Sequence, residues 1–494
     1  MSGAARRLAT RDLRGEHFGF FEVWGPIGDG GMSRVWLARH RALSIPVILK
    51  TLLAEGESWE AFSQLLNEAR LMARIPSPRV VRAVDAGVHE GIPYLAQEYV
   101  DGIDLDELCR RRRQTLGAAL PLWFVCRSAY EVADALHSAH QTGVLHRDVK
   151  PSNLFGAPQT GVRLGDFGIA VTRGLSNAVA TGTPLFVAPE TLHGEPIGRQ
   201  CDIYSLGATA FNLRYGRPPF PSISDILGSQ PPPFPPAPTA EEAYFQHVVR
   251  RMLERDPRRR FPTISAVRRL LRTLTGMLKP PPTATSEGHG IYQLGPVRIL
   301  CERGDIADAQ VDGIVSSAND EMKMRTGVGE ALRRRGGQVI EDEAMSGGGR
   351  ALGECVVTGG GTLACRHVLH AVSAWKEASC IARTCQRAFL LAEELHLKSL
   401  ALPALGTGVA RVSPEASAYA TASALLQHVQ LGGTGLREVR FVLYDKETYD
   451  VFVDELNGVF LGDTEYHADT GELEGHSTEE VGDQATMYMP FKSR

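Results

Sequence analysis

The sequence predicts a multidomain protein in which an α+β region is followed by a separate α/β layered region. The chain has 494 residues, more than one ordinary domain contains. From about His17 to Leu274, strand-like stretches come first and helix-like stretches follow, whereas short apolar strands alternate with helices from about Ile291 to Leu456. Between the two regions, the stretch LKPPPTATSEGHG at 278–290 has the Pro, Ser and Gly content of a linker.

These changes in composition divide the chain into five segments. The last segment is acidic and poor in aliphatic residues, which indicates disorder. We expect an N-terminal extension over residues 1–16, a first domain over 17–275, a linker over 276–290, a second domain over 291–457 and a disordered tail over 458–494.

Composition and charge exclude several classes of protein. The formal net charge of −4 does not match a nucleic-acid binder. The eight cysteines include no CxxC pair, and scattered thiols fit a reducing compartment. Because no run of about 18 apolar residues occurs, nothing is expected to cross a membrane. We therefore expect a soluble cytoplasmic protein with neither a nucleic-acid nor a membrane partner.

A glycine-rich stretch lies between two predicted strands near the N-terminus. Glycine lets a hairpin approach phosphates closely, with backbone N–H groups facing the negative charge. An ordinary turn is the alternative, because Ser33 occupies the third glycine position of a G-x-G-x-x-G pattern. The candidate phosphate-binding residues are Ile27, Gly28, Asp29, Gly30, Gly31, Met32, Ser33, Arg34 and Val35.

Lys50 ends the next strand-like stretch, PVILK, and Glu68 lies in the helical stretch that follows. A lysine at the end of a strand is usually solvated. It can instead hold phosphates while paired with a helical glutamate, so that both charges are satisfied on burial.

The segment HRDVKPSN, His146 to Asn153, carries the strongest chemical signal. Asp148 can accept the proton of a substrate hydroxyl, and Lys150 can neutralise charge on a transferring phosphoryl group. Asn153 and Asp166 supply oxygen ligands for Mg²⁺, with Mn²⁺ as the alternative metal.

Further motifs follow in order: VAPE at 187–190, DIYSLG at 202–207 and DPRRR at 256–260. The region from His17 to Leu274 thereby resembles the protein kinase family, in particular bacterial eukaryotic-type Ser/Thr kinases. This resemblance implies a bilobal α+β fold, ATP as cofactor and protein Ser/Thr hydroxyls as substrates. It also implies that Glu98 and Val100 hold adenine through backbone groups, and that Glu190 pairs with Arg260. A pseudokinase is the alternative, but Lys50, Asp148 and Asp166 are all intact.

Arg147, which precedes the catalytic aspartate, marks regulation by phosphorylation of the activation segment in kinases that this chain resembles. Thr172, Ser176, Thr181 and Thr183 are the candidates. In the family the hydroxyl at Thr183 contacts the catalytic aspartate, so we expect Thr181 to be the leading phosphosite, with Thr183 and Ser176 behind it.

The second region resembles a macro domain, the ADP-ribose-binding module, over Ile291 to Leu456. The resemblance rests on four stretches: residues 302–320, 353–372, 399–415 and 439–452. It implies a three-layer α/β fold that binds ADP-ribose or ADP-ribosylated proteins, with Asp305 on adenine, Asn319 near the distal ribose and backbone N–H groups on the diphosphate. The candidate residues are Asp305, Ile306, Asn319, Gly327, Val328, Gly406, Thr407, Gly408 and Val409.

This sequence departs from the macro domain pattern at three places. Arg325 and Thr326 replace two glycines of the first phosphate loop, Gly329 replaces the aspartate of many ADP-ribose hydrolases, and Val409-Ala410-Arg411 replaces an aromatic segment. Binding is therefore favoured over hydrolysis. Three functions remain open: a kinase tuned by ADP-ribose, an ADP-ribosyl hydrolase regulated by the kinase, and a scaffold with a silent kinase.

Overall fold

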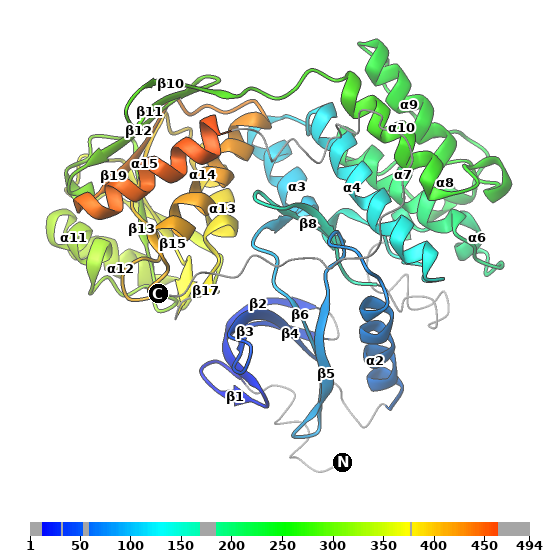
Figure 1. Ribbon diagram of the computed structural model, residues 1–494, viewed down its shortest axis with the longest axis horizontal. Helices are drawn as coiled ribbons and strands as arrows, with labels where there is room; N and C mark the ends of the chain where they lie inside the picture. Colours follow the sequence, from blue (N-terminus) through cyan, green and yellow to red (C-terminus); the bar gives the residue numbers. More distant parts are fainter. Residues whose placement is uncertain (1–11, 31–32, 53–58, 168–183, 376–377, 463–494) are drawn as a thin grey trace, which may run out of the picture. The chain divides into compact units, whose positions relative to one another are not determined.

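The computed structural model describes residues 12–30, 33–52, 59–167, 184–375 and 378–462. Residues up to 278 form the first module and residues 284–462 the second (Figure 1). The first module begins with an antiparallel sheet in the order β1-β2-β3-β4-β6-β5, and α2 packs against β5 and β6. These elements are β1 His17–Phe18, β2 Phe21–Gly30, β3 Ser33–His40, β4 Ile45–Leu52, α2 Trp59–Ala73, β5 Ala83–His89 and β6 Ile92–Glu98.

Alternation along β4 divides its side chains between the two faces of this sheet. Val47 and Leu49 are fully buried in one cluster together with Trp36 of β3. Ile48 and Lys50 therefore share the opposite face. This second face matters below because it carries the lysine predicted to bind phosphate.

A mainly helical lobe follows the sheet, with a small sheet in the order β7-β8-β9. Its long helix α3 begins at Asp104, whose carboxylate accepts the Glu107 amide, and ends at Gly117 in the left-handed conformation. The elements are β7 Ile103–Asp104, α3 Leu105–Leu116, α4 Leu122–Gln141, η1 Pro151–Asn153, β8 Leu154–Ala157, β9 Gly161–Leu164, η2 Pro184–Phe186, α6 Pro189–Leu192, α7 Gln200–Tyr215, α8 Ile223–Leu227, α9 Ala240–Met252, η3 Pro257–Arg259 and α10 Ile264–Met277.

The ion pair expected between Glu190 and Arg260 is confirmed. The guanidinium donates to both carboxylate oxygens, at 2.6 and 2.8 Å, and both residues are buried. It also donates to the carbonyls of Glu254, Gln200 and Arg255. The pair therefore ties α6 to the segment between α9 and α10.

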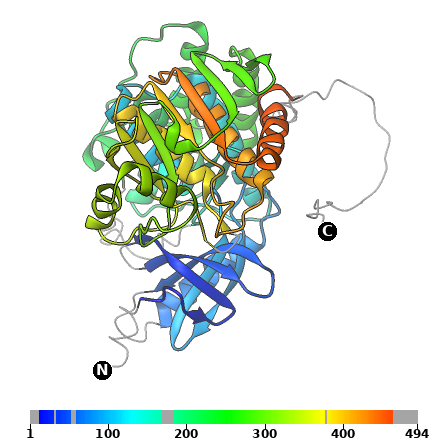
Figure 2. The same ribbon diagram turned by 90° about the vertical axis from the view of Figure 1, so that its left-hand side faces the viewer.

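The second module is built on a mixed sheet in the order β10-β11-β12-β19-β18-β13-β15-β14, whose strands are seen side by side in Figure 2. Pairings among β12, β19, β18, β13 and β15 are parallel. The strands are β10 Ala284–Gly288, β11 Ile291–Leu294, β12 Val297–Arg303, β13 Gly313–Ser317, β14 Cys355–Gly359, β15 His367–Ala371, β18 Ser399–Leu402 and β19 Glu438–Leu443, with β16 Ala374–Trp375 and β17 Ala378–Ser379 forming a separate hairpin.

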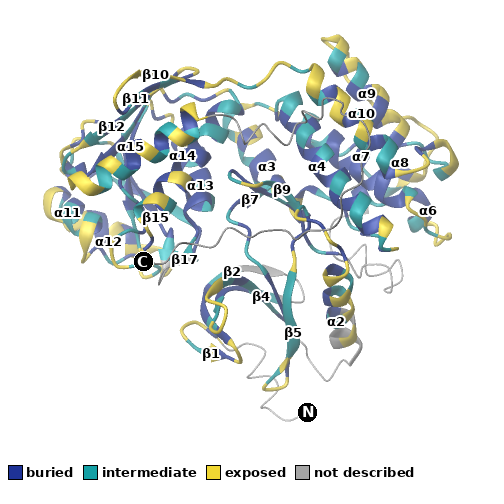
Figure 3. Cartoon of the chain, in the orientation of Figure 1, coloured by how far each residue is buried: buried dark blue, intermediate teal, exposed yellow. Residues whose placement is uncertain are grey.

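Neighbouring residues of the central strands belong to two different cores, which makes this module three-layered. On β13, Ile314 packs with α11 and α12, whereas Val315 packs with α13 and α14. Figure 3 shows the buried sheet between helices whose outer faces are exposed. The helices are η4 Ile306–Asp308, α11 Gly327–Gly336, α12 Val339–Ser346, α13 Ile381–Glu394, α14 Pro414–Gln430 and α15 Lys446–Leu461.

The short apolar strands expected to alternate with helices between Ile291 and Leu456 are present, β13, β15, β18 and β19 among them. Within the range 276–290 expected to be a linker, α10 continues to Met277 and residues 284–288 form the edge strand β10. Four of the five residues of β10 are exposed, so the strand lacks the alternation that would reveal it. Likewise α15 runs to Leu461, beyond the expected end of the second domain.

The cysteine thiols and the helix lengths relate to two expectations drawn from composition, namely scattered free thiols and the absence of a membrane-spanning segment. All eight cysteines are free, and burial raises the pKa of Cys380 to about 12 and that of Cys365 to about 11. Both thiols are therefore protonated at neutral pH. Across the described part of the chain, no helix combines the length and the apolar character needed to span a membrane.

Candidate functional site

The loop from His146 to Asn153 connects α4 to β8 and is anchored by Asp202 of α7. The fully buried carboxylate of Asp202 accepts the backbone amides of His146 and Arg147, at 3.0 and 2.7 Å, and lies 2.7 Å from Nε2 of His140. Burial alone would raise the pKa of Asp202, but hydrogen bonding to His140 outweighs it and the pKa is lowered. The carboxylate thus stays charged and holds the loop, including Arg147 at a positive φ of 68°.

Asp148, Lys150 and Asn153 lie together in this loop. The Lys150 ammonium is 2.8 Å from Oδ2 of Asp148. Nδ2 of Asn153 donates to the backbone carbonyl of Asp148 at 2.8 Å and to Oδ2 at 3.1 Å. Three residues selected from the sequence therefore form one cluster, in which the carboxylate is oriented by two donors.

Asn153 and Asp166 are brought together through Gly165. The Gly165 amide donates to the Asn153 carbonyl at 2.9 Å, and the Gly165 carbonyl lies 2.9 Å from Nε2 of His146. Because the Asn153 amide nitrogen is engaged with Asp148, its side-chain oxygen is the group directed elsewhere. An amide oxygen beside a carboxylate is a donor set that suits Mg²⁺.

Lys50 forms an ion pair and hydrogen bond with Asp166. The expected pair with Glu68 is not formed among the described residues, although Glu68 is close enough for its charge to act on Lys50. Burial disfavours the Lys50 ammonium, but Asp166 and Glu68 outweigh it and raise its pKa. Burial raises the pKa of Glu68 to about 7 despite Lys50. The lysine thus joins the two lobes through Asp166.

The predicted nucleotide-binding residues are distributed along β2, β3 and the segment after β6. Gly28, Asp29 and Gly30 pair with Val35, Arg34 and Ser33 across the β2–β3 hairpin. Gly31 and Met32 lie outside the described residues. Glu98 ends β6, where its carboxylate contacts Arg82 at 3.2 Å and Arg163 at 2.5 Å.

The candidate phosphosites lie in residues 168–183, outside the described ranges. This applies to Thr172, Ser176, Thr181 and Thr183. Within the described residues, Nε of Arg147 is buried without a hydrogen-bond partner.

The residues predicted to bind ADP-ribose gather at one edge of the second sheet. Asp305 follows β12, Asn319 follows β13, and Gly406 to Val409 follow β18. Because these strands are parallel to one another or to a shared neighbour, their carboxyl ends meet at the same edge. Ligands of open α/β sheets bind at that edge.

Local contacts explain how these residues are held. The Asp305 carboxylate accepts the Ala307 amide at 3.0 Å, so it caps η4, and it lies 3.4 Å from Arg335. The Asn319 side chain accepts the Lys323 amide at 3.0 Å. Gly327 begins α11 with a positive φ of 54°. After β18, Gly406 has a φ of 77°, and Val409 is 81% exposed.

Sequence reasoning missed two residues of these sites. Asp202 was visible only as part of the DIYSLG motif, without its role as anchor. Tyr444 follows β19, is 84% exposed and lies next to the Gly304–Leu443 backbone hydrogen bond. An exposed aromatic residue whose backbone adjoins the Gly304–Asp305 segment can stack on a base. An aromatic residue at the end of a strand was the available signal.

Comparison with known families agrees with the geometry of the first module. Residues 21–270 match the family model described as "Protein kinase domain". This chain belongs to the protein kinase family. The first module is called the kinase module below. Residues 315–421 match the model described as "Macro domain", so the second module is called the macro module.

Several curated relatives are bacterial. The chain is 32% identical over 264 residues to the serine/threonine-protein kinase PknJ of Mycobacterium tuberculosis, covering 50% of this chain and 44% of PknJ. It is also 32% identical to PknB of that organism, covering 50% of this chain and 42% of PknB, and to Pkn1 of Myxococcus xanthus, covering 53% and 39%. The chain thus spans less than half the length of these relatives. Among solved structures, this chain is similar to the M. tuberculosis PknI kinase domain, at 29% identity and a TM-score of 0.44. The match covers 53% of this chain and 98% of the PknI chain.

Proposed function

We propose that this chain is a protein Ser/Thr kinase that transfers the γ-phosphoryl group of ATP to Ser or Thr hydroxyls of protein substrates. The observation that carries this proposal is the cluster of Asp148, Lys150 and Asn153 beside Asp166. A silent kinase scaffold is disfavoured, because every charged group of this cluster is present and paired.

Each residue of the cluster has a distinct role. Asp148 accepts or orients the proton of the attacking hydroxyl, and Lys150 offsets charge on the phosphoryl group in transit. Lys50 and the backbone of the β2–β3 hairpin position the phosphates. Asn153 and Asp166 would hold Mg²⁺, or Mn²⁺ in its place, and the metal would supply positive charge that offsets the charge of the phosphates.

Asp148→Asn should lower the rate of phosphotransfer by about 10²- to 10⁴-fold, the usual contribution of a general base. The measurement is incorporation of labelled phosphate by the purified full chain. Binding of a fluorescent ATP analogue should stay within about two-fold of wild type, because Asp148 is assigned no nucleotide contact.

Asp134→Asn on α4 is the matched control, since it makes the same chemical change away from the cluster. Substantial autophosphorylation by Asp148→Asn would contradict the assignment of the base.

Mapping the phosphorylated residues of the wild-type chain tests whether the activation segment is modified. We propose Thr181 as the leading phosphosite there, because a phosphate would offer Arg147 an anionic partner.

We propose ADP-ribose, free or attached to a protein, as the ligand of the macro module. Support comes from the gathering of Asp305, Asn319, Gly327 and Gly406 at the carboxyl edge of parallel strands, with Tyr444 beside Asp305. The alternative, an ADP-ribosyl hydrolase, lacks an acid at Gly329. An added Cβ there would also meet Met324 Cα at 3.3 Å.

Asp305→Ala should weaken ADP-ribose binding by about 5- to 150-fold, the loss expected for one hydrogen bond to a partly buried carboxylate. Calorimetry on the full chain measures it. Asp308→Ala is the matched control, because Asp308 lies on the same short helix and also pairs with Arg335.

Equal effects of the two substitutions would mean that Asp305 acts only by holding Arg335. An absence of heat at millimolar ADP-ribose would make the macro module a protein-contact domain. Rapid release of ADP-ribose from modified protein would favour the hydrolase instead.

A further inference from the structure

Helix α13 of the macro module begins on a carboxylate of the kinase module. Asp101 lies between β6 and β7, in the segment that joins the two kinase lobes. Its two oxygens accept the backbone amides of Ala382 and Arg383, each at 3.0 Å, and Tyr99 donates to it at 3.1 Å. The helix's own N-cap residue, Cys380, makes no side-chain cap. A kinase residue therefore caps a macro helix.

One turn further along α13, Gln386 continues this contact. Its side-chain oxygen accepts the Ile103 amide at 2.9 Å, and its nitrogen donates to the Gly156 carbonyl at 3.0 Å. Ile103 and Gly156 are opposite each other in the β7–β8 pair. Gln386 is only 5% exposed, so both of these buried backbone groups depend on it.

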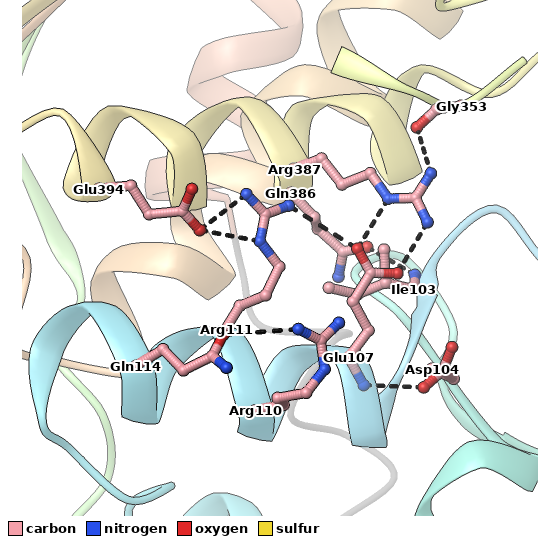
Figure 4. Close-up of polar contacts among 10 residues, drawn as sticks. All are labelled: Ile103, Asp104, Glu107, Arg110, Arg111, Gln114, Gly353, Gln386, Arg387 and Glu394. Atoms are coloured by element: carbon pink, nitrogen blue, oxygen red, sulfur yellow. Dashed lines mark hydrogen bonds and ion pairs between the residues drawn. The ribbon is translucent and has the colours of Figure 1, made fainter. Parts of the chain in front are cut away.

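Two ion pairs connect α13 to α3 (Figure 4). Arg387 donates to both oxygens of Glu107, at 2.8 and 2.7 Å, and to the Gly353 carbonyl at 2.8 Å. Arg111 donates twice to one oxygen of Glu394, at 3.0 and 2.9 Å. Burial favours a raised pKa for Glu107, but its hydrogen bonds and proximity to Arg387 outweigh this and lower it. Glu107 and Arg387 are therefore both charged, and such a bidentate pair fixes the relative orientation of the two side chains as well as their distance.

A second contact joins the macro module to the sheet of the kinase module. Trp24 and Leu37, at 4% and 0% exposure, belong to the same apolar cluster as Met322, which is 1% exposed. Ile48 also packs there, and it shares a face of β4 with Lys50. The other members are Ala344, Leu352, Val372, Cys380, Ile27, Tyr99, Ala318 and Val356.

Met322 belongs to the loop that begins at Asn319 and ends at Gly327, both of which are predicted to contact ADP-ribose. It has a left-handed φ of 60°, and its amide donates to the Asn319 carbonyl. The loop therefore contacts the nucleotide-binding face of the kinase sheet from a position next to the proposed ligand site.

We propose that the macro module is an intramolecular restraint on the kinase module, docked through α13 on α3 and through the Asn319–Gly327 loop on the kinase sheet. It contacts both lobes and the segment between them, so lobe opening must break one of the contacts. Opening lets nucleotide enter and product leave, so the docked state turns over slowly. A ligand bound at the Asn319–Gly327 loop releases the restraint. This last step rests on the proposed ADP-ribose site.

The test is a charge exchange in the full chain. Glu107→Arg and Arg387→Glu should each raise the phosphorylation rate by about five-fold or more, the lower range of typical couplings between sites. The double variant restores an ion pair in reversed order and should return to within about two-fold of wild type.

Arg111 and Glu394 provide a second pair in case the first set fails to fold, with Arg111 also lying 3.7 Å from Glu107. A groove of about 610 Å³ lies beside this pair, so a substituted side chain of opposite charge would have access to solvent. The groove is lined by Glu107, Arg110, Arg111, Gln114, Thr115, Glu394 and His396. Arg111→Glu, Glu394→Arg and their combination should repeat the pattern. Arg298→Glu is the matched control, since its partner Glu287 lies in the macro module and both are about half exposed. It should leave the rate unchanged.

The ligand arm separates this proposal from the proposed function. ADP-ribose should raise the wild-type rate by about five-fold and leave the released Glu107→Arg variant unchanged. If calorimetry detects no binding, ADP-ribose is excluded as the releasing ligand. The charge-exchange variants would still test whether the macro module restrains the kinase module. Folded single variants whose rate is unchanged or lower, or a double variant that fails to revert, would overturn it.

Discussion

His370, on β15, is fully buried in the macro module and has one polar neighbour. Its Nε2 lies 2.9 Å from the Thr358 hydroxyl, which donates to the Gly359 carbonyl at 3.1 Å. The hydroxyl can then only accept from Nε2–H, and among the described residues Nδ1 has no partner. Burial lowers the pKa of His370 from 6.5 to about 4. The folded chain therefore keeps this imidazole neutral.

This shift predicts how stability depends on pH. The unfolded chain takes up a proton at His370 between pH 6.5 and pH 4, whereas the folded chain does not, so stability falls as pH falls through this window. From pH 7 to pH 5 the loss should be about 2 kcal/mol. His370→Gln cannot titrate and should lose correspondingly less in denaturant unfolding at the two pH values.

His289→Gln provides the comparison, because His289 is exposed in the same module. Its pH dependence should equal that of wild type. Equal pH dependence in all three proteins would mean that His370 is not held neutral by the fold.

At the scale of elements, α6 depends on a charge supplied from the segment before α10. Removing the guanidinium in Arg260→Met leaves Glu190 buried without its partner, which typically costs about 3–5 kcal/mol. Denaturant unfolding should show this loss. Arg258→Met is the control, because Arg258 lies two residues away and pairs with Asp256 on the surface. A similar loss in both variants would mean that the cost arises from the loop rather than from the buried pair.

Sequence patterns predicted elements well where one side of the element is apolar and the other is not. The central strands of the macro module alternate between two cores, and the kinase motifs bring Asp148, Lys150 and Asn153 into one loop. The edge strand β10 gave no such signal, because it is exposed along most of its length. Pairing of Lys50 with Asp166 was equally hidden, since the choice between two nearby carboxylates depends on the relative placement of elements.

At the scale of the whole molecule, the sequence indicated two modules but not how they meet. One face of α13 carries the apolar residues that enter the macro core, such as Phe389. Its other face carries Gln386, Arg387 and Glu394, which a helical pattern assigns to solvent. In the structure this polar face is the docking face, and Leu390 between these residues joins the kinase core. The periodicity of a helix distinguishes its apolar face from its polar face. It does not show which polar faces are covered by another module.

Asp101 and the first amides of α13 are 281 positions apart in the chain and share one helix terminus. A genetic cut at 278–283 that moved the macro module to another protein would leave that terminus uncapped, and Ile103 and Gly156 would lose the amide that serves them both. Separating the two modules would therefore leave unsatisfied backbone groups on both fragments, unless Asp101 and α13 were carried together.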